Sequence, residues 1–271
     1  MAAFANYGFP ESHSVSFAYL VYASAWFKRF HPAAFCAALL NSQPMGFWSP
    51  HSLTRDARRH GVVVNQPCIN ASQSLASLED DPSSTSGLAV RLGLSSVRGI
   101  GRELADAVAA GRPYADMEDL VRRVPALNAA QVEALATAGA FSTFGVARRD
   151  ALWAAGAVVQ SRPDRLAGVT VGAQSPVLPG MEPVEEAIAD LWATGISPDG
   201  HPTVFLRGEL DARGVLTAEA LGRAPHGERV LVAGVRGSRG PFTLAPALVL
   251  HGPDGRFTAE VEAMHRGEAP R

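Results

Sequence analysis

The stretch Val97-Arg98-Gly99-Ile100-Gly101, followed by Arg102–Ala110 and a stop at Gly111, decides how the middle of this chain folds. Two glycines on either side of one apolar residue predict a tight turn, because glycine adopts backbone angles that a Cβ atom excludes. Ile100 is expected to be buried and to fix the turn on a core. The residues that follow are predicted to form a helix, which Gly111 ends.

A turn of this kind brings backbone N–H groups to the start of a helix, where they can approach a phosphate closely. This is the mechanism of a helix-hairpin-helix element, which contacts the DNA backbone without reading sequence. Taken alone, a Gly-x-Gly before a helix is more often a turn that binds nothing, and the setting among short helices adds support for binding. The candidate DNA-binding residues here are Val97, Arg98, Gly99, Ile100, Gly101 and Arg102.

Downstream, capping and stop residues predict further helices. Asn128 caps one of them and Gly139 ends it. These helices are predicted over residues 116–124, 129–138 and 147–159, and with the alternating stretch Ala89–Leu94 they form a compact, all-helical unit. No internal repeat is evident.

The N-terminal part is also predicted to be helical, with helices over residues 14–30, 32–41 and 50–59 and a short strand at 62–64. Phe17, Leu20 and Phe27 recur at helical spacing, so the first helix is expected to be buried. The aromatic residues there are expected to belong to the core rather than to stack on bases: Tyr7, Phe9, Phe17, Tyr19, Tyr22 and Trp26.

Polar, proline-rich and glycine-rich stretches predict the domain boundaries. Residues 79–87 are interpreted as a boundary and residues 161–179 as a linker, which an acidic helix follows. Val and Leu runs at 229–235 and 244–250 suggest strands of a small sheet or barrel. The fold class is multi-domain and mostly α, divided into 1–78, 88–160, 161–205 and an incomplete β-barrel at 206–271.

Composition narrows the class of protein. The chain has 271 residues, 47% of them hydrophobic, and a formal net charge of -2, so a uniformly basic nucleic-acid coat is not indicated. Cys36 and Cys68 have no close Cys or His partners, which argues against a disulfide scaffold or zinc site. No apolar run is long enough to span a bilayer, so we expect no membrane partner and a cytoplasmic location.

Charged side chains offer a second candidate DNA contact and no catalytic centre. Arg55, Arg58 and Arg59 lie along one side of a predicted helix and could meet phosphates, although the residues alone favour a solvated helix face. Four histidines show no metal-ligand spacing and are expected to cap helices or to lie in the core: His13, His31, His51 and His60. There is no Asp-x-Asp in a strand-like setting of the kind that clamps two magnesium ions.

Several runs resemble bacterial family C DNA polymerases, and within them the error-prone, damage-tolerant branch. The resemblance covers residues 4–235 and is carried by these motifs: Phe9-Pro10-Glu11-Ser12-His13, the run from Leu39 to Phe47, Asp56–Gly61, Leu92–Leu94, Val97–Gly101, Ala138–Phe141 and Arg149–Trp153. After Val235 the sequence departs from the family pattern, so no barrel function is carried over to residues 236–271.

The resemblance implies DNA-directed DNA synthesis across lesions, with Ser12 and His13 close to the incoming nucleotide and the template base. It implies DNA partners, a primer-template duplex and a single-stranded template, together with deoxynucleoside triphosphates and other mutagenesis proteins. In the intact family enzyme Mg²⁺ supports nucleotide transfer. We expect this chain alone to bind no metal and to extend no primer, because the metal-binding acids of the family have no match in it. The rival interpretations are a stand-alone helix-hairpin-helix scaffold and a remnant without function.

Overall fold

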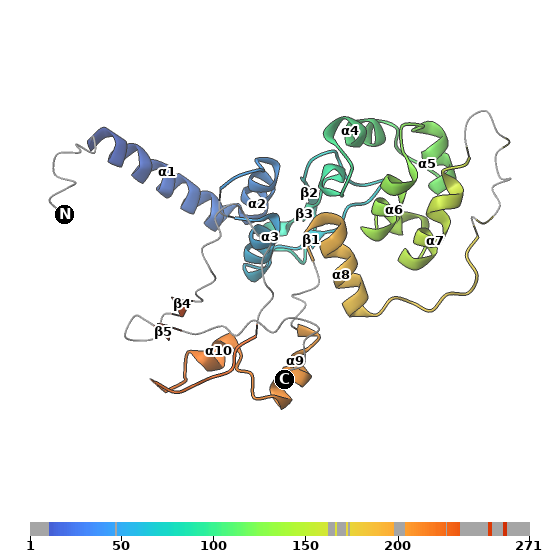
Figure 1. Cartoon of the computed structure of the whole chain (residues 1–271). Helices are drawn as coiled ribbons and strands as arrows, with labels where there is room; N and C mark the ends of the chain where they lie inside the picture. Colours follow the sequence, from blue (N-terminus) through green and yellow to red (C-terminus); the bar gives the residue numbers. More distant parts are fainter. Residues whose placement is uncertain are drawn as a thin grey trace. The chain divides into compact units, whose positions relative to one another are not determined.

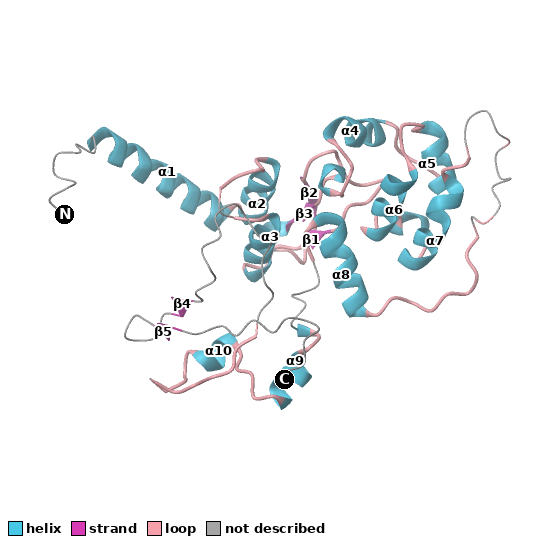
Figure 2. Cartoon of the chain, viewed as in Figure 1, coloured by secondary structure: helices cyan, strands magenta, loops and turns pink. Residues whose placement is uncertain are grey.

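The computed structural model describes residues 11–46, 48–161, 166, 172, 174–197, 204–225, 227–233, 249–250 and 257–258. The chain divides into two compact units, residues 1–200 and 201–271, which we describe separately. Figures 1 and 2 show that helices dominate the first unit, as the sequence predicts. Its α-helices are α1 (Glu11–Phe30), α2 (Pro32–Asn41), α3 (Pro50–Arg59), α4 (Arg102–Ala110), α5 (Met117–Arg123), α6 (Ala129–Thr137), α7 (Arg148–Val158) and α8 (Pro183–Thr194).

A small three-stranded sheet stands between the N-terminal helices and α4–α7. Its strands are β1 (Val64–Asn65), β2 (Ser77–Asp80) and β3 (Leu88–Arg91), in the order β1-β3-β2. β3 is parallel to β1, with Val90 opposite Val64, and antiparallel to β2, with Val90 opposite Leu78. The sheet packs with α2 and α3 to form one core of the first unit, which contains Cys36, Ala57, Val90 and Leu92.

The interpretation of residues 79–87 as a domain boundary is wrong. Residues 79–80 belong to β2, and a short 3-10 helix, η2 (Thr85–Gly87), leads into β3. The Asp81 N–H donates to the Gly87 carbonyl, and the Ser84 hydroxyl donates to the Leu88 carbonyl. The polar composition therefore marks the turn of a β-hairpin, which needs small and polar residues as much as a linker does. The two later boundaries of the predicted division, at residues 161 and 206, stay predictions.

A second core lies among α4, α5, α6 and α7. Its largest fully buried side chain is Phe141, and Val97, Ile100, Leu120 and Leu135 belong to the same core. Two 3-10 helices complete this part, η3 (Leu94–Ser96) and η4 (Ser142–Phe144). The predicted bounds of α2, α3 and α4 are confirmed, and those of α5, α6 and α7 agree within one residue.

Helix α8 belongs to both cores. Ala193 near its end is buried in the core of α4–α7, whereas Ile196, just after the helix, is 1% exposed in the core of the sheet, α2 and α3. Gly195 ends α8 in the left-handed conformation, at φ 71°, and so turns the chain toward the core of the sheet, α2 and α3. The α8 segment therefore ties the two cores together.

The expectation that α1 is buried is wrong. Its apolar side chains are exposed, among them Val15, Tyr19, Leu20, Tyr22 and Trp26. α1 contacts the rest of the first unit at its C-terminal end, where Lys28 forms an ion pair with Asp56 of α3 at 2.8 Å. Apolar periodicity correctly predicted a helix, but it does not say whether anything within the chain covers that helix. Tyr7 and Phe9 lie outside the described residues.

The second unit has little regular structure among its described residues. It contains α9 (Arg207–Ala212), α10 (Ala218–Leu221) and a two-stranded pair, β4 (Val249–Leu250) with β5 (Phe257–Thr258). Of the strand predicted at 229–235, residues 229–233 are described, and they form a single bridge between Leu231 and Val215. The barrel therefore stays a prediction, and most of residues 234–271 lies outside the described part.

Candidate nucleic-acid interface

The hairpin of residues 97–101 has the geometry that its glycines predict. Gly99 lies at φ 76°, in the region that favours glycine, and Gly101 occupies the N-cap position of α4. Val97 and Ile100 are buried at 2% and 4% exposure, and the Ile100 N–H donates to the Val97 carbonyl at 3.0 Å. Two apolar side chains thus anchor the turn while its glycines face outward.

The surface over this hairpin is open. A Cβ atom at Gly101 would meet nothing within 4 Å, and one at Gly99 would meet only the Gln131 Cγ, at 3.9 Å. The first-turn N–H groups of α4 have no carbonyl four residues earlier in the helix, and Gly101 has no side chain to cap them. The arrangement therefore presents uncapped backbone donors, at the positive end of a helix dipole, to any anion that approaches.

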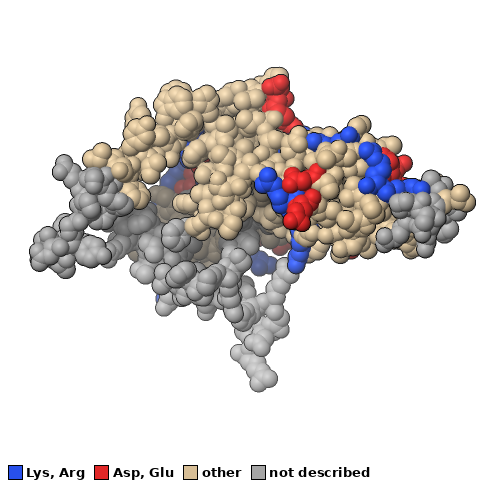
Figure 3. Space-filling model, turned by 90° about the horizontal axis from the view of Figure 1, so that it is seen from above, with Lys and Arg blue, Asp and Glu red and all other residues tan. Residues whose placement is uncertain are grey.

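Side-chain charge adds little at this helix start. Arg102 and Glu103 carry opposite charges, and Arg102 lies 3.5 Å from Asp106 in an exposed ion pair. On the face shown in Figure 3, Lys and Arg side chains lie next to Asp and Glu side chains rather than in one continuous basic patch. Backbone donors are therefore the main source of attraction for an anion at the hairpin.

Arg98 is held by two contacts with the α8 helix. Its backbone N–H donates to the Ala193 carbonyl at 2.7 Å, and its guanidinium lies 4.9 Å from the centre of the Trp192 ring. The Arg98 N–H is therefore already used within the fold. The side chain remains exposed, and its contact with DNA stays a prediction.

The other candidate residues lie elsewhere in the first unit. Arg55 and Arg59 are exposed on α3, and Arg58 donates to the Ser197 carbonyl at 3.4 Å. Figure 1 shows α3 beside α2, away from α4, so the arginines of α3 and the hairpin do not form one cluster. Ser12 and His13 fall in the first turn of α1, and their side chains lie outside the described residues.

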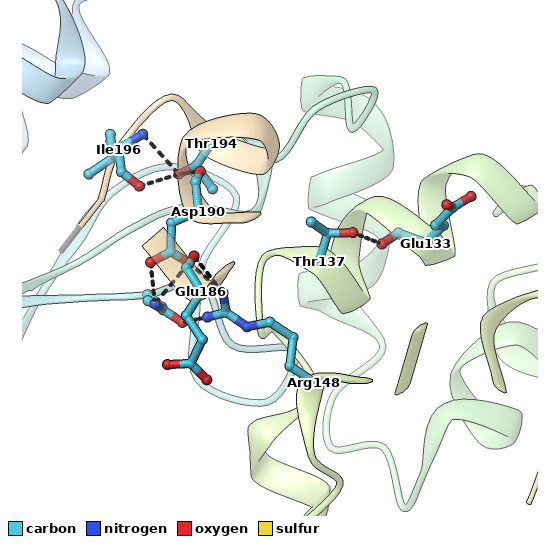
Figure 4. A network of polar contacts seen from close by, with 8 residues as sticks. Glu133, Thr137, Arg148, Glu186, Asp190, Thr194 and Ile196 are labelled. Carbon is cyan, nitrogen blue, oxygen red and sulfur yellow. Dashed lines mark hydrogen bonds and ion pairs between the residues drawn. The ribbon is translucent and has the colours of Figure 1, made fainter. Parts of the chain in front are cut away.

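Figure 4 shows a buried polar network that sequence reasoning missed. Arg148, at the start of α7, donates to Asp190 of α8 at 2.8 Å and to the Gln66 side-chain oxygen at 2.9 Å. Gln66 in turn donates to Asp190 at 3.1 Å. The side chains of Arg148 and Asp190 are only 10% and 3% exposed, so each charge needs the other to offset its loss of hydration.

Gly139 leaves the space that the Gln66 and Arg148 side chains of this network occupy. A Cβ atom there would lie 2.8 Å from the Gln66 side-chain oxygen and 2.9 Å from an Arg148 nitrogen, closer than such contacts allow. The one signal in the sequence was an acid, Asp190, spaced three residues from each of Ala187 and Ala193 on the buried face of α8. A buried acid on an apolar face predicts a basic partner, although spacing alone cannot name it.

Among the described residues, no group of three or more His, Cys, Asp or Glu side chains could hold a metal ion. Within the same residues, no helix is both long enough and apolar enough to cross a membrane.

The turn of residues 97–101 is anchored by apolar side chains, lined by glycines and placed at an uncapped helix start. This geometry defines the class of the element as a helix-hairpin-helix motif. In agreement, residues 61–151 match the helix-hairpin-helix motif family.

Most of the chain is homologous to one part of curated error-prone DNA polymerases. It is 58% identical over 238 residues to the error-prone DNA polymerase of Mycobacterium bovis. The aligned region covers 86% of this chain and 21% of the relative. The corresponding protein of Nocardia farcinica is 54% identical over 244 residues, and that of Corynebacterium glutamicum is 46% identical over 235 residues. They cover 86% and 87% of this chain and 21% of each relative. The chain thus spans about a fifth of the length of these relatives, and the resemblance expected from its motifs is confirmed.

Proposed function

We propose that this chain is a DNA-binding part of an error-prone DNA polymerase, and that the hairpin of residues 97–102 holds a backbone phosphate of primer-template DNA. One observation carries the proposal: the hairpin leaves its helix start uncapped and open, in a chain 58% identical to a protein named as such a polymerase. Contacts of this kind position DNA without reading its sequence. They suit an enzyme that must act on any template.

The wider activity is proposed from the relatives' name. Primer extension past damaged bases, with deoxynucleoside triphosphates and Mg²⁺, belongs in this proposal to the polymerase as a whole. The chain by itself is proposed to bind DNA and to extend no primer. Extension of a labelled primer by the purified chain, with nucleotides and Mg²⁺ present, would refute that part.

The hairpin is tested by Gly101→Asp. Gly101 has φ -71° and ψ 165°, which any residue adopts, so the backbone accepts the change. The new carboxylate can cap α4, so stability should stay equal or rise by a few tenths of a kcal/mol. The same carboxylate would take the donors that a phosphate needs. Opposite changes in stability and in DNA binding would exclude unfolding as the cause of lost binding.

Binding is measured on a fluorescent primer-template at several salt concentrations, beside Ala130→Asp as the control for added charge. Ala130 is exposed in the first turn of α6. We expect the wild type to bind with a steep salt dependence and Gly101→Asp to lose roughly 0.9 from the slope of log K against log salt, the value for one phosphate. Equal binding by Gly101→Asp and Ala130→Asp would contradict the proposal.

A further inference from the structure

The structure contains a second hairpin that repeats the first. Val124-Pro125-Ala126-Leu127-Asn128 stands in the same relation to α6 as residues 97–101 do to α4, and both helices have nine residues. The Leu127 N–H donates to the Val124 carbonyl at 3.0 Å, as that of Ile100 does to Val97. The apolar anchors Val124 and Leu127 are buried as well, at 6% and 2% exposure.

The two hairpins differ in their donors. Asn128 takes the place of Gly101, and its side chain accepts the Gln131 N–H at 3.0 Å. The Gln131 side-chain oxygen accepts the Asn128 N–H at 3.0 Å, which completes a capping box. The donors that the first hairpin leaves open are therefore filled in the second by the chain itself.

Gln131 also connects the hairpins. Its side-chain amide nitrogen donates to the Gly99 carbonyl at 3.0 Å. On the other side of the same turn, the Arg98 N–H is held by the Ala193 carbonyl of α8. The turn is thus fixed by α6 and by α8 at two neighbouring residues, and the open donors of Gly101 and the first turn of α4 follow directly after.

We propose that the second hairpin is a brace rather than a DNA contact, and that Gln131 is a positioning residue that holds the Gly99–Gly101 turn ready for a phosphate. The inference rests on the proposed function of the first hairpin. A turn that is already fixed loses less conformational freedom when the phosphate binds, so the brace should raise affinity without touching DNA. Gln131 itself is half-buried, and both of its side-chain polar atoms are occupied.

Gln131→Glu separates the two roles of this side chain. Glutamate at the third helical position completes a capping box as glutamine does, so α6 should keep its cap. A carboxylate has no N–H to donate, so the bond to the Gly99 carbonyl is lost. Ala130→Glu adds the same charge one residue away and leaves that bond intact. Gln131→Met removes the same bond without adding a charge, and so serves as a second test variant if the carboxylate of Gln131→Glu perturbs the fold.

The experiment measures primer-template binding at several salt concentrations, urea unfolding, and hydrogen exchange of the peptide that covers residues 97–104. We expect Gln131→Glu to bind roughly tenfold more weakly than Ala130→Glu, and Gln131→Met roughly tenfold more weakly than the wild type, because the phosphate then has to order the backbone of about one residue. Exchange in residues 97–104 should be faster, with the urea midpoint of Gln131→Glu unchanged.

The outcomes separate the inference from the proposed function. If the wild type does not bind, or if Gly101→Asp binds as Ala130→Asp does, the proposed function fails and the inference falls with it. If Gly101→Asp loses binding but Gln131→Glu binds as Ala130→Glu does and Gln131→Met binds as the wild type does, the hairpin binds DNA and the positioning role of Gln131 is overturned.

Discussion

The ion pair between Arg148 and Asp190 is a residue-scale feature with a measurable cost of removal. Because Asp190 is buried, Arg148→Ala would leave an uncompensated charge, and we expect the free energy of unfolding to fall by about 3–5 kcal/mol. Arg149 provides the control, since its ion pair with Glu185 is far more exposed and should contribute at most about 1 kcal/mol. Urea unfolding of the two alanine variants compares them. Equal losses would contradict the buried role of the network.

Cys36 gives the stability a dependence on pH. Burial, helped by the negative charge of Asp56, raises the pKa of the Cys36 thiol from 9.0 to about 12. Below pH 9 the thiol is protonated in both folded and unfolded chains, so its contribution to stability is fully present. Between pH 9 and 12 only the unfolded chain loses the proton, and stability falls by up to about 1.4 kcal/mol per pH unit.

The thiol's contribution is isolated by comparison with Cys36→Ala, because Tyr114 also has a pKa raised by burial. We expect the stability advantage of the wild type over Cys36→Ala to shrink as pH rises from 9 toward 12. Urea unfolding at each pH measures it. A constant difference over that range would show that the thiol ionises in the folded chain as it does in the unfolded one.

At the scale of the element, α1 carries a surface that the rest of the described chain does not cover. Tyr19 and Tyr22 are 73% and 72% exposed. Replacing both with glutamine should change the free energy of unfolding by no more than about 0.5 kcal/mol, because exposed side chains have few contacts to lose. The same change should lower dye binding and self-association, which exposed apolar patches promote. Sedimentation and dye fluorescence measure these, and a loss of stability above 1 kcal/mol would show that α1 is covered in solution.

The elements that local chemistry fixes were predictable, and those that depend on distant partners were not. Ser49 caps α3 and accepts the Ser52 N–H, and Gly99 supplies the left-handed turn before α4, so each boundary follows from a few adjacent residues. The network of Gln66, Arg148 and Asp190 joins residues 82 and 124 positions apart, which no spacing rule connects. The first hairpin was found through its glycines. The second was missed because Ala126 and Asn128 replace them, although the apolar anchors have the same spacing.

At the scale of the whole first unit, α8 should make the two cores unfold together. Ile196→Ala removes a side chain that is 1% exposed in the core of the sheet, α2 and α3, and should cost about 2–5 kcal/mol. Ala193, three residues earlier, lies in the other core. The loss should therefore appear in both cores as a similar fall in hydrogen-exchange protection, in peptides from residues 33–64 and 120–141.

Ile188, within α8, is the matched control, because it is 58% exposed and its replacement by alanine should cost no more than about 0.5 kcal/mol. If Ile196→Ala lowers protection only in residues 33–64, the cores are separate cooperative units and α8 merely rests against both. If protection falls in both, α8 couples them. The hairpin that α8 and α6 hold would then depend, for its readiness to meet a phosphate, on the stability of the N-terminal core as well as its own.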